Sequence, residues 1–258
     1  MSASRTHFSS AKRIVVKVGS SSISGENAGK IDALVAALAE SHDSGREVIL
    51  VSSGAIATGL PLFNLENRPD DLPTSQALAA VGQSRLIARY QEQLEKFGII
   101  AGQVLLTSGD LEADETRANA RRAMDRLLEL RVLPIVNEND TVATAEIRFG
   151  DNDRLAALVA VLVEADALVL LSDVDALYTA PPTQPGATRI AQVSYDDDLS
   201  SIEIGGTSTG VGTGGAVTKV SAAKLANAAG IDVLLTSTDN VSFALNGENV
   251  GTLFERAK

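Results

Sequence analysis

Amide and carboxylate side chains gather at two places in the chain, each beside a run of core-forming residues. The apolar pair Ile135-Val136 leads directly into Asn137–Asp140, and further along Asp151–Asp153 precedes an apolar helical stretch. Polar groups held this close to a hydrophobic core cost free energy unless something pairs with them. One such cluster alone would favour a solvated turn, because Asn and Asp dominate turns. The alternative is a ligand that carries amines, carboxylates or phosphates, and the rest of the chain supports it.

A lysine interrupts the first apolar run of the chain. Lys17 lies between Val16 and Val18, and Gly19-Ser20 follows immediately. A lysine in such a run is commonly a guard on an edge strand. The flanking valines instead favour a central strand, so we expect Lys17 to contact a phosphate group.

A second lysine follows a glycine-rich stretch. Residues Gly205–Gly215 lead into a helix that we expect from Ala216 to Ala229, with Lys219 in its first turn. In isolation such a stretch would be a flexible linker, but a glycine-rich turn that opens a helix also binds phosphate. A lysine there opposes the helix dipole by about 0.3–1 kcal/mol on an exposed helix. A bound polyphosphate explains Lys219 better than a solvated surface position does.

Two known nucleotide-binding motifs could account for the glycines and lysines of the chain. Gly210, Gly212 and Gly215 match G-x-G-x-x-G, but too little chain follows for a dinucleotide-binding half, and we reject that interpretation. No Gly-Lys-Ser/Thr occurs, so a Walker A motif is absent.

Two lysines, a glycine-rich helix start and several carboxylates predict phosphoryl transfer, which depends on positioning and charge neutralisation. A carboxylate acceptor is already ionised at neutral pH, which suits a chain with 2 His.

The elements that must position these residues alternate along the chain. Nearly continuous apolar strands alternating with helices predict an α/β fold, with a mainly parallel central sheet sandwiched by helices. In such sheets ligands bind beyond the carboxyl ends of the strands, and five of the expected strands end in small, glycine-containing or polar residues. Pro134 would be unfavourable inside a central strand, because a proline there removes a ladder hydrogen bond, but it is tolerable as the first residue of a strand. The expected strands are Ile14–Val18, Val48–Val51, Gln103–Leu106, Ile135–Val136, Leu168–Leu171 and Val233–Leu235, and the expected helices are Ile31–Leu38, Ser75–Lys96, Asn119–Leu130, Leu155–Val163 and Ala216–Ala229.

Composition narrows the class of protein. The chain has 258 residues, 45% of them hydrophobic, which is enough for one large α/β domain or two lobes. A formal net charge of −11 argues against a nucleic-acid surface, and the absence of Cys excludes disulfides and thiolate metal sites. No apolar run approaches the ~18 residues that span a bilayer, and the amino terminus lacks a secretory signal. We expect a soluble cytoplasmic protein without nucleic-acid or membrane partners.

Several short motifs between about Arg13 and Phe254 occur together in one known group of enzymes. Combined, they resemble the amino acid kinase family and, within it, the glutamate 5-kinases; the run Asn137–Asp140 separates this group from its relatives. The resemblance is to the kinase domain only, without the carboxyl-terminal PUA domain that many relatives append. The motifs are Val16–Ser21, Ser52–Ala57, Ala80–Gln83, Val136–Asp140, Phe149–Asp153, Ser172–Asp175 and Gly212–Gly215.

The resemblance implies a reaction and a division of the chain. The reaction is transfer of the ATP γ-phosphoryl group to the side-chain carboxylate of L-glutamate, with Mg²⁺, as the first step of proline biosynthesis. A glutamate-binding lobe of about residues 13–165 and an ATP-binding lobe of about residues 166–258 are expected within a single domain. The resemblance also implies a homo-oligomer and proline as a feedback inhibitor.

The resemblance further implies a role for each matching residue. Lys17 and Lys219 would neutralise the transferring phosphoryl group, and Asp153, with Asp151 nearby, would hold the two ammonium groups in place. The residues expected to bind glutamate are Ser53, Asp140 and Asn152, with Asp140 suited to the α-ammonium group; those expected to bind ATP are Lys17, Ser172, Asp173, Thr213, Gly214, Gly215, Ala216, Val217, Thr218 and Lys219.

Two alternatives remain open from the sequence. The chain could be a sibling kinase that acts on another carboxylate, such as N-acetylglutamate or aspartate. It could also be a nucleotide-binding sensor or storage protein that has lost catalysis, although none of the expected catalytic positions is visibly replaced. Turnover with a panel of acceptors distinguishes these possibilities.

Overall fold

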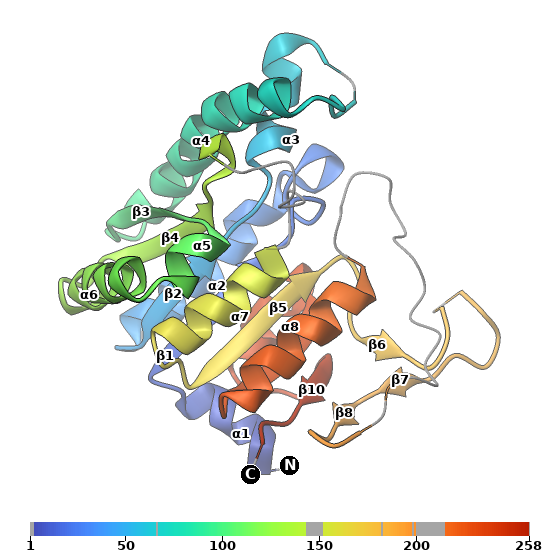
Figure 1. Ribbon diagram of the computed structural model, residues 1–258. Helices are drawn as coiled ribbons and strands as arrows, with labels where there is room; N and C mark the ends of the chain where they lie inside the picture. Colours follow the sequence, from blue (N-terminus) through green and yellow to red (C-terminus); the bar gives the residue numbers. More distant parts are fainter. Residues whose placement is uncertain are drawn as a thin grey trace.

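The computed structural model describes residues 3–65, 67–142, 152–181, 183–197, 199 and 215–257. In this part of the chain an eight-stranded sheet has the order β3-β4-β2-β1-β5-β9-β10-β8, and helices cover both of its faces (Figure 1). The strands from β3 to β9 in this order are all parallel, β10 is antiparallel to β9, and β8 is parallel to β10. The expected α/β fold with a mainly parallel sheet is confirmed. The strands are β1 Arg13–Val18, β2 Glu47–Val51, β3 Ala101–Leu106, β4 Leu133–Glu138, β5 Ala167–Ser172, β8 Gln192–Val193, β9 Asp232–Ser237 and β10 Thr252–Phe254, and a separate pair is formed by β6 Leu177–Tyr178 and β7 Arg189–Ile190.

The helices divide between the two faces of the sheet according to their apolar sides. Buried residues of α2, α4 and α9 pack together on one face, and those of α6, α7 and α8 pack on the other. Figure 1 shows α7 and α8 side by side across the sheet. The longer helices are α1 Ala3–Ser10, α2 Lys30–Asp43, α4 Leu72–Glu95, α6 Asp114–Glu129, α7 Asn152–Leu162 and α8 Ala216–Ala228; the short ones are α3 Ala55–Gly59, α5 Ser108–Glu112, α9 Val241–Leu245, η1 Gly25–Asn27, η2 Leu60–Phe63, η3 Asp140–Val142 and η5 Thr238–Asn240.

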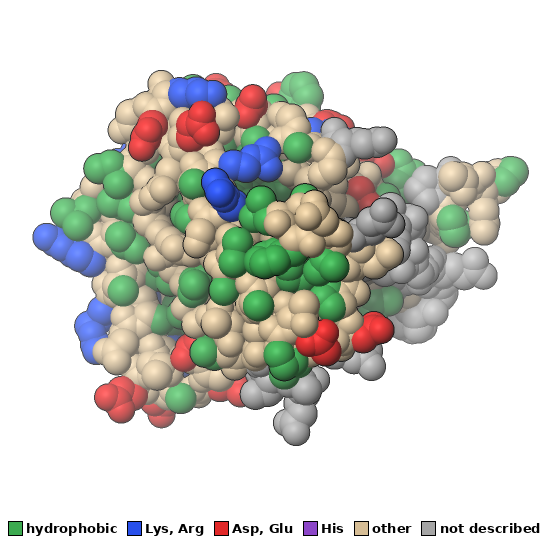
Figure 2. Space-filling view, turned by 90° about the horizontal axis from the view of Figure 1, so that it is seen from above, with side chains coloured by type: hydrophobic (Ala, Val, Ile, Leu, Met, Phe, Trp, Pro, Cys, Tyr) green, Lys and Arg blue, Asp and Glu red, His purple; other side chains and the backbone are tan. Residues whose placement is uncertain are grey.

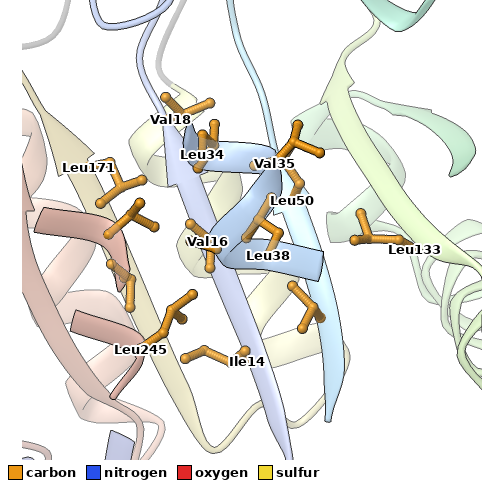
Figure 3. Packing of buried hydrophobic residues seen from close by; sticks show 14 of the residues in the cluster. Ile14, Val16, Val18, Leu34, Val35, Leu38, Leu50, Leu133, Leu171 and Leu245 are labelled. Carbon is orange, nitrogen blue, oxygen red and sulfur yellow. The ribbon is translucent and has the colours of Figure 1, made fainter. Parts of the chain in front are cut away.

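Strand β1 lies in the centre of the sheet, paired with β2 on one side and β5 on the other. Side chains of a strand alternate between the faces. Ile14, Val16 and Val18 therefore pack toward α2 (Figure 3), whereas Val15 belongs to the core beneath α7 and α8. Lys17 has the same parity as Val15 and so points to the α7 and α8 face. The expected central strand is confirmed, and the edge-guard interpretation of Lys17 is wrong.

Strand β4 differs from its expected bounds at both ends. Pro134 is its second residue, not its first, and lies opposite Gly102 of β3, while pairing with β2 begins only at Ile135. The proline therefore precedes the part of β4 that has partners on both sides. At the other end the strand continues through Asn137 and Glu138, which pair with Leu105 and Leu106 of β3. The buried Asn137 side chain finds a hydrogen-bond partner inside the protein.

The lobe boundary expected near residue 165 runs through a continuous sheet. Strands β1 and β5, which would belong to different lobes, are hydrogen-bonded neighbours. The assignment of acceptor and nucleotide to the two halves stays a prediction. Among the described residues, no helix is long and apolar enough to cross a membrane.

Candidate active site

Most of the residues expected to act on a ligand lie near one edge of the sheet. The arrow of β5 points toward the top of Figure 1, and its parallel neighbours end on the same side. Figure 2 looks down on this edge and shows basic and acidic side chains scattered among apolar ones. Carboxyl ends of parallel strands are where open α/β sheets bind ligands, so this edge is the candidate active site.

A buried cluster of charged side chains lies at the end of β1. The Lys17 Nζ atom is 2.6 Å from Asp153 Oδ1, and the Lys219 Nζ atom is 3.1 Å from Asp153 Oδ2. The three side chains are only 6%, 8% and 2% exposed for Lys17, Lys219 and Asp153. The structure thus brings together the two distant ammonium groups on one carboxylate, as expected, and excludes a solvated surface position for Lys219.

Three elements position this cluster. Lys17 points to the α7 and α8 face through the alternation of β1, and Asp153 lies in the first turn of α7. A carboxylate there is favoured by the helix dipole and by the free amide groups of the helix start. Lys219 lies on α8, which packs beside α7. The neighbouring Thr218 hydroxyl is 2.9 Å from both Asp153 Oδ2 and the Gly215 carbonyl oxygen, either of which accepts its proton.

The charges of the cluster are unequal, because two ammonium groups face one carboxylate. Burial alone would raise the pKa of Asp153, but the ammonium groups of Lys17 and Lys219, with hydrogen bonds from Lys17 and Thr218, bring this pKa below its ordinary value. Asp153 is therefore an ionised anchor and cannot serve as a proton carrier near neutral pH. The excess positive charge of the three side chains suits an anionic group such as a transferring phosphoryl.

The residues expected to bind the acceptor follow neighbouring strands. Ser53 follows β2, and Asp140 begins η3 just beyond β4; the two strands pair up to Val51 and Val136. Burial and, to a smaller extent, the negative charge of the nearby Glu138 raise the pKa of Asp140 to about 7, while Arg68 partly opposes this increase. A cationic ligand group beside Asp140 would relieve this cost by stabilising the carboxylate.

Asn152 lies next to Asp153 at the start of α7 and is 5% exposed. Its Oδ1 atom is buried and has no hydrogen-bond partner among the described residues. Buried polar side-chain atoms are nearly always hydrogen-bonded, so this oxygen is a candidate acceptor for a ligand N–H or O–H. The expected contact of Asn152 with glutamate stays a prediction.

The other residues expected to bind the nucleotide lie at the carboxyl end of β5 and at the start of α8. The Ser172 hydroxyl donates to Asp173 Oδ1 at 3.0 Å, and Asp173 is exposed. Gly215 precedes α8, Ala216 is half-buried, and the side chain of Val217 is 60% exposed. Of the expected residues, Asp151, Thr213 and Gly214 lie outside the part of the chain that the structure describes.

Sequence reasoning assigned no role to four polar residues that connect α4 to the sheet. The Asn137 Nδ2 atom donates to Gln83 Oε1 at 2.7 Å, and the hydroxyl oxygens of Ser52 and Tyr90 are 3.0 Å apart. A signal was present, because Gln83 and Tyr90 are spaced as neighbours on the buried stripe of α4, with Leu86 and Leu94. A polar side chain at a core-facing helix position requires a partner.

The resemblance implies Mg²⁺, and the fit of this ion depends on the oxygen ligands offered by the described residues. They contain no group of three or more His, Cys, Asp or Glu side chains that could hold a metal ion, and two lysines already contact Asp153. Mg²⁺ commonly keeps several waters and is bound largely through substrate phosphates. The described residues fit an ion that enters with the nucleotide.

The chain is similar to proteins of known families. A family model described as the amino acid kinase family matches residues 12–237. A glutamate 5-kinase of Clavibacter michiganensis subsp. michiganensis is 69% identical over 252 residues, covering 98% of this chain and 97% of the relative. A glutamate 5-kinase of Leifsonia xyli subsp. xyli is 66% identical over 255 residues, covering 98% and 94%.

More distant relatives extend the comparison. A glutamate 5-kinase of Streptomyces avermitilis is 55% identical over 260 residues, and these cover 98% of this chain but 69% of that longer protein. A solved structure, carbamate kinase from Giardia lamblia bound to AMP-PNP, superposes with a TM-score of 0.69 at 16% identity, covering 96% of this chain and all of the other. At this identity the solved structure shows the fold alone.

Proposed function

The chain belongs to the amino acid kinase family, and we propose that it transfers the γ-phosphoryl group of ATP to the side-chain carboxylate of L-glutamate. The observation that carries this proposal is the contact of Lys17 and Lys219 with the two oxygens of Asp153. Relatives at 69% and 66% identity that cover nearly the whole chain are glutamate 5-kinases, which supports glutamate as the acceptor and proline biosynthesis as the context.

The reaction needs little covalent chemistry from the protein. A carboxylate oxygen of glutamate forms the new bond to the γ-phosphorus, the bond to the β,γ-bridging oxygen breaks, and ADP leaves with the electron pair. The acceptor carboxylate is already ionised at neutral pH, since its ordinary pKa is about 4.3. No general base is required, which agrees with the role of Asp153 as an ionised anchor.

Lys17 and Lys219 would stabilise the negative charge of the transferring group. A unit charge about 4 Å away contributes of order 4 kcal/mol at an effective dielectric near 20. Since each 1.36 kcal/mol changes a rate tenfold, two such contacts account for several orders of magnitude. Asp153 would act by holding both ammonium groups at the right positions. Mg²⁺, bound mainly through the nucleotide phosphates, would supply further charge neutralisation.

The acceptor would bind where Asp140, Ser53 and Asn152 approach the edge of the sheet. The α-ammonium group of glutamate would pair with Asp140, and the raised pKa of that carboxyl would fall on binding. Ser53 and the buried Asn152 amide would bind the remaining polar groups of glutamate. ATP would contact the stretch from Gly215 to Lys219, where backbone amides at the start of α8 would face the phosphates, and the Ser172-Asp173 turn.

Acceptor-dependent release of ADP tests the proposal. The purified chain, with ATP and Mg²⁺, should release ADP with L-glutamate and much less with N-acetylglutamate, aspartate or no acceptor. Lys17→Ala and Lys219→Ala should abolish this activity, with a rate loss of roughly a thousandfold or more. The matched control is Lys224→Ala, which removes an exposed lysine of the same helix α8 and should leave the rate unchanged.

Two outcomes would defeat the proposal. Full activity of both Lys17→Ala and Lys219→Ala would leave the reaction without its charge stabilisation. Tight ATP binding by the unaltered chain without turnover of any of the acceptors would favour a nucleotide-binding protein without catalysis.

A further inference from the structure

Helix α4 connects to the ends of both strands that precede the proposed acceptor residues. Its Gln83 contacts Asn137 of β4, and its Tyr90 contacts Ser52, which directly follows β2. Building on the proposed function, we infer that Gln83 is a positioning residue that sets the affinity for glutamate by holding the end of β4 and thereby Asp140. Gln83 acts here through Asn137 and not through contact with either substrate.

The hydrogen bonds define the orientation of the Asn137 side chain. Its Oδ1 atom accepts the Glu138 backbone N–H at 2.9 Å, so its amide nitrogen faces Gln83 Oε1, to which it donates at 2.7 Å. Gln83 is 8% exposed and Asn137 is 1% exposed. A hydrogen bond in such a dry environment is strong, and a lost partner is correspondingly costly. Each end of the Asn137 amide therefore has a defined position.

The alternation of β4 explains why α4 is the helix that makes this contact. Ile135 packs in the core beneath α2 and α4, whereas Val136 packs in the opposite core. Asn137 has the same parity as Ile135 and therefore points toward α4. The chain just after β4 is held by the neighbouring strand β3, because the Asn139 N–H donates to the Leu106 carbonyl at 3.0 Å. Asp140 follows directly, at the start of η3.

Close packing of α4 against α3 ties the Ser53 side of the site to the same helix. A Cβ atom on Gly82 would lie 1.8 Å from the Ala55 carbonyl oxygen and 2.6 Å from the Gly59 nitrogen. Gly82 thus allows α3, which begins just after Ser53 and Gly54, to lie directly on α4. The adjacent Gly82 and Gln83 therefore link α4 to both chain segments that carry proposed acceptor-binding residues.

The expected kinetic effect is selective. The Gln83 contact lies on the α4 face of the sheet, whereas Lys17, Lys219 and Asp153 gather on the α7 and α8 face. Loss of the contact should displace Asp140 without displacing the charged cluster. We expect the KM for glutamate to rise roughly tenfold, the size of effect that one net hydrogen bond supplies. The KM for ATP should change by less than about twofold.

The test compares variants that differ in one hydrogen-bonding atom. Gln83→Met keeps the length of the side chain and removes the acceptor oxygen, while Gln83→Glu keeps an acceptor oxygen and should recover part of the affinity. Asn137→Asp keeps the acceptor for the Glu138 N–H but removes the donor to Gln83, and should reproduce Gln83→Met. The matched control is Gln91→Met on the exposed side of α4. Steady-state KM for glutamate, KM for ATP and kcat are measured for each.

Each outcome bears on the inference. A selective rise of the glutamate KM in Gln83→Met and Asn137→Asp, with a double variant no worse than either single one, supports it. An unchanged glutamate KM, equal increases for both substrates, or a loss of kcat alone overturns it. If Gln83→Met does not fold, Asn137→Asp and Gln83→Glu decide by the same criteria. Failure of the unaltered chain to phosphorylate glutamate overturns the proposed function and the inference together.

Discussion

The two faces of the central sheet meet the candidate site with different chemistry. On the α7 and α8 face, Lys17, Lys219 and Asp153 form a buried charged cluster. On the α4 face, Gln83–Asn137 and Tyr90–Ser52 form neutral hydrogen bonds. Both sets lie at the carboxyl ends of the strands, yet alternation along each strand keeps them apart. Charge is concentrated where the phosphoryl group would pass, and neutral contacts hold the proposed acceptor-binding segments.

This difference has an energetic meaning. Removing one partner of a buried ion pair costs about 3–5 kcal/mol, because a charge remains buried without compensation. Losing a neutral hydrogen bond costs about 0.5–1.5 kcal/mol, or somewhat more if a buried group is left unpaired. Changes on the charged face should therefore cost more stability and lower kcat, whereas changes on the α4 face should cost less stability and affect the affinity for the acceptor more than kcat.

Substitution of the shared carboxylate should have the largest effect. Asp153→Asn leaves two buried lysines without a counter-charge, and we expect the free energy of unfolding to fall by about 3–5 kcal/mol and glutamate-dependent ADP release to be lost. Chemical denaturation and the ADP assay measure the two effects. The control is Asp239→Asn, which breaks an exposed ion pair with Lys30 and should cost under about 1 kcal/mol. If Asp153→Asn and Asp239→Asn lowered the free energy of unfolding by similar amounts, burial would not be the reason for the large cost expected at Asp153.

Disturbing the contact of α3 with α4 should have the next largest effect. Alanine normally stabilises a helix over glycine by about 1 kcal/mol, but in Gly82→Ala the new methyl group would overlap the Ala55 carbonyl. We expect the free energy of unfolding to fall by about 1–3 kcal/mol and the glutamate KM to rise, as measured by denaturation and kinetics. Gly29→Ala, where a Cβ meets nothing within 4 Å, should be nearly neutral. A stabilised Gly82→Ala would show that the helices can separate freely.

Titration of Asp140 should appear in the kinetics of the acceptor. Because burial raises its pKa to about 7, the carboxylate that would pair with the α-ammonium group is present above that pH and is lost below it. We expect kcat/KM for glutamate to fall about tenfold per pH unit below pH 7, while kcat/KM for ATP at saturating glutamate lacks this decrease. Asp140→Asn should bind glutamate weakly without that pH dependence; an unchanged profile in this variant would assign the titration to another group.

Removal of one hydroxyl on the α4 face should have the smallest effect. Tyr90→Phe removes the 3.0 Å contact of the Ser52 hydroxyl and leaves it only the longer hydrogen bond to the Ser53 carbonyl oxygen at 3.4 Å, so we expect the free energy of unfolding to fall by about 1 kcal/mol. The glutamate KM should rise by at most a few fold, because Ser52 adjoins Ser53. Thermal unfolding and kinetics measure both effects, and Tyr195→Phe, at a residue that is 42% exposed, is the control. A loss of kcat as large as that of Lys17→Ala would erase the distinction between the two faces.

The charged face could be predicted well from the sequence. The valines beside Lys17 indicated a central strand, and the glycine-rich stretch before Lys219 indicated a helix start; both predictions are confirmed. The chemistry was visible because an unusual residue type interrupts a clear apolar or glycine pattern. The start of α7 was not predicted, because apolar periodicity begins only at Leu155, whereas the helix begins at Asn152 and includes Asp153 in its first turn.

The α4 face was much harder to predict. Gln83 and Asn137 are ordinary polar residues, and a polar residue after an apolar run usually indicates the end of a strand. Strand β4 nevertheless continues through Asn137, which pairs with Leu105 of β3, and Gln83 of a helix far away in the chain satisfies the buried side-chain amide. Pairing of this kind is a property of two segments together. The position of Gln83 on the buried stripe of α4 indicates that it needs a partner, but local patterns do not say which residue supplies it.

The sequence by itself determined the kinds of side chain available, the alternation that builds a parallel sheet and the edge where a ligand would bind. These follow from local periodicity and from the geometry common to parallel sheets. The resemblance implied that Lys17 and Lys219 meet on Asp153, but only the tertiary structure showed the burial and distances of this contact and that Gln83 holds Asn137. Contacts between distant segments form only when the packed core brings them together, and burial then gives these polar groups their energetic weight.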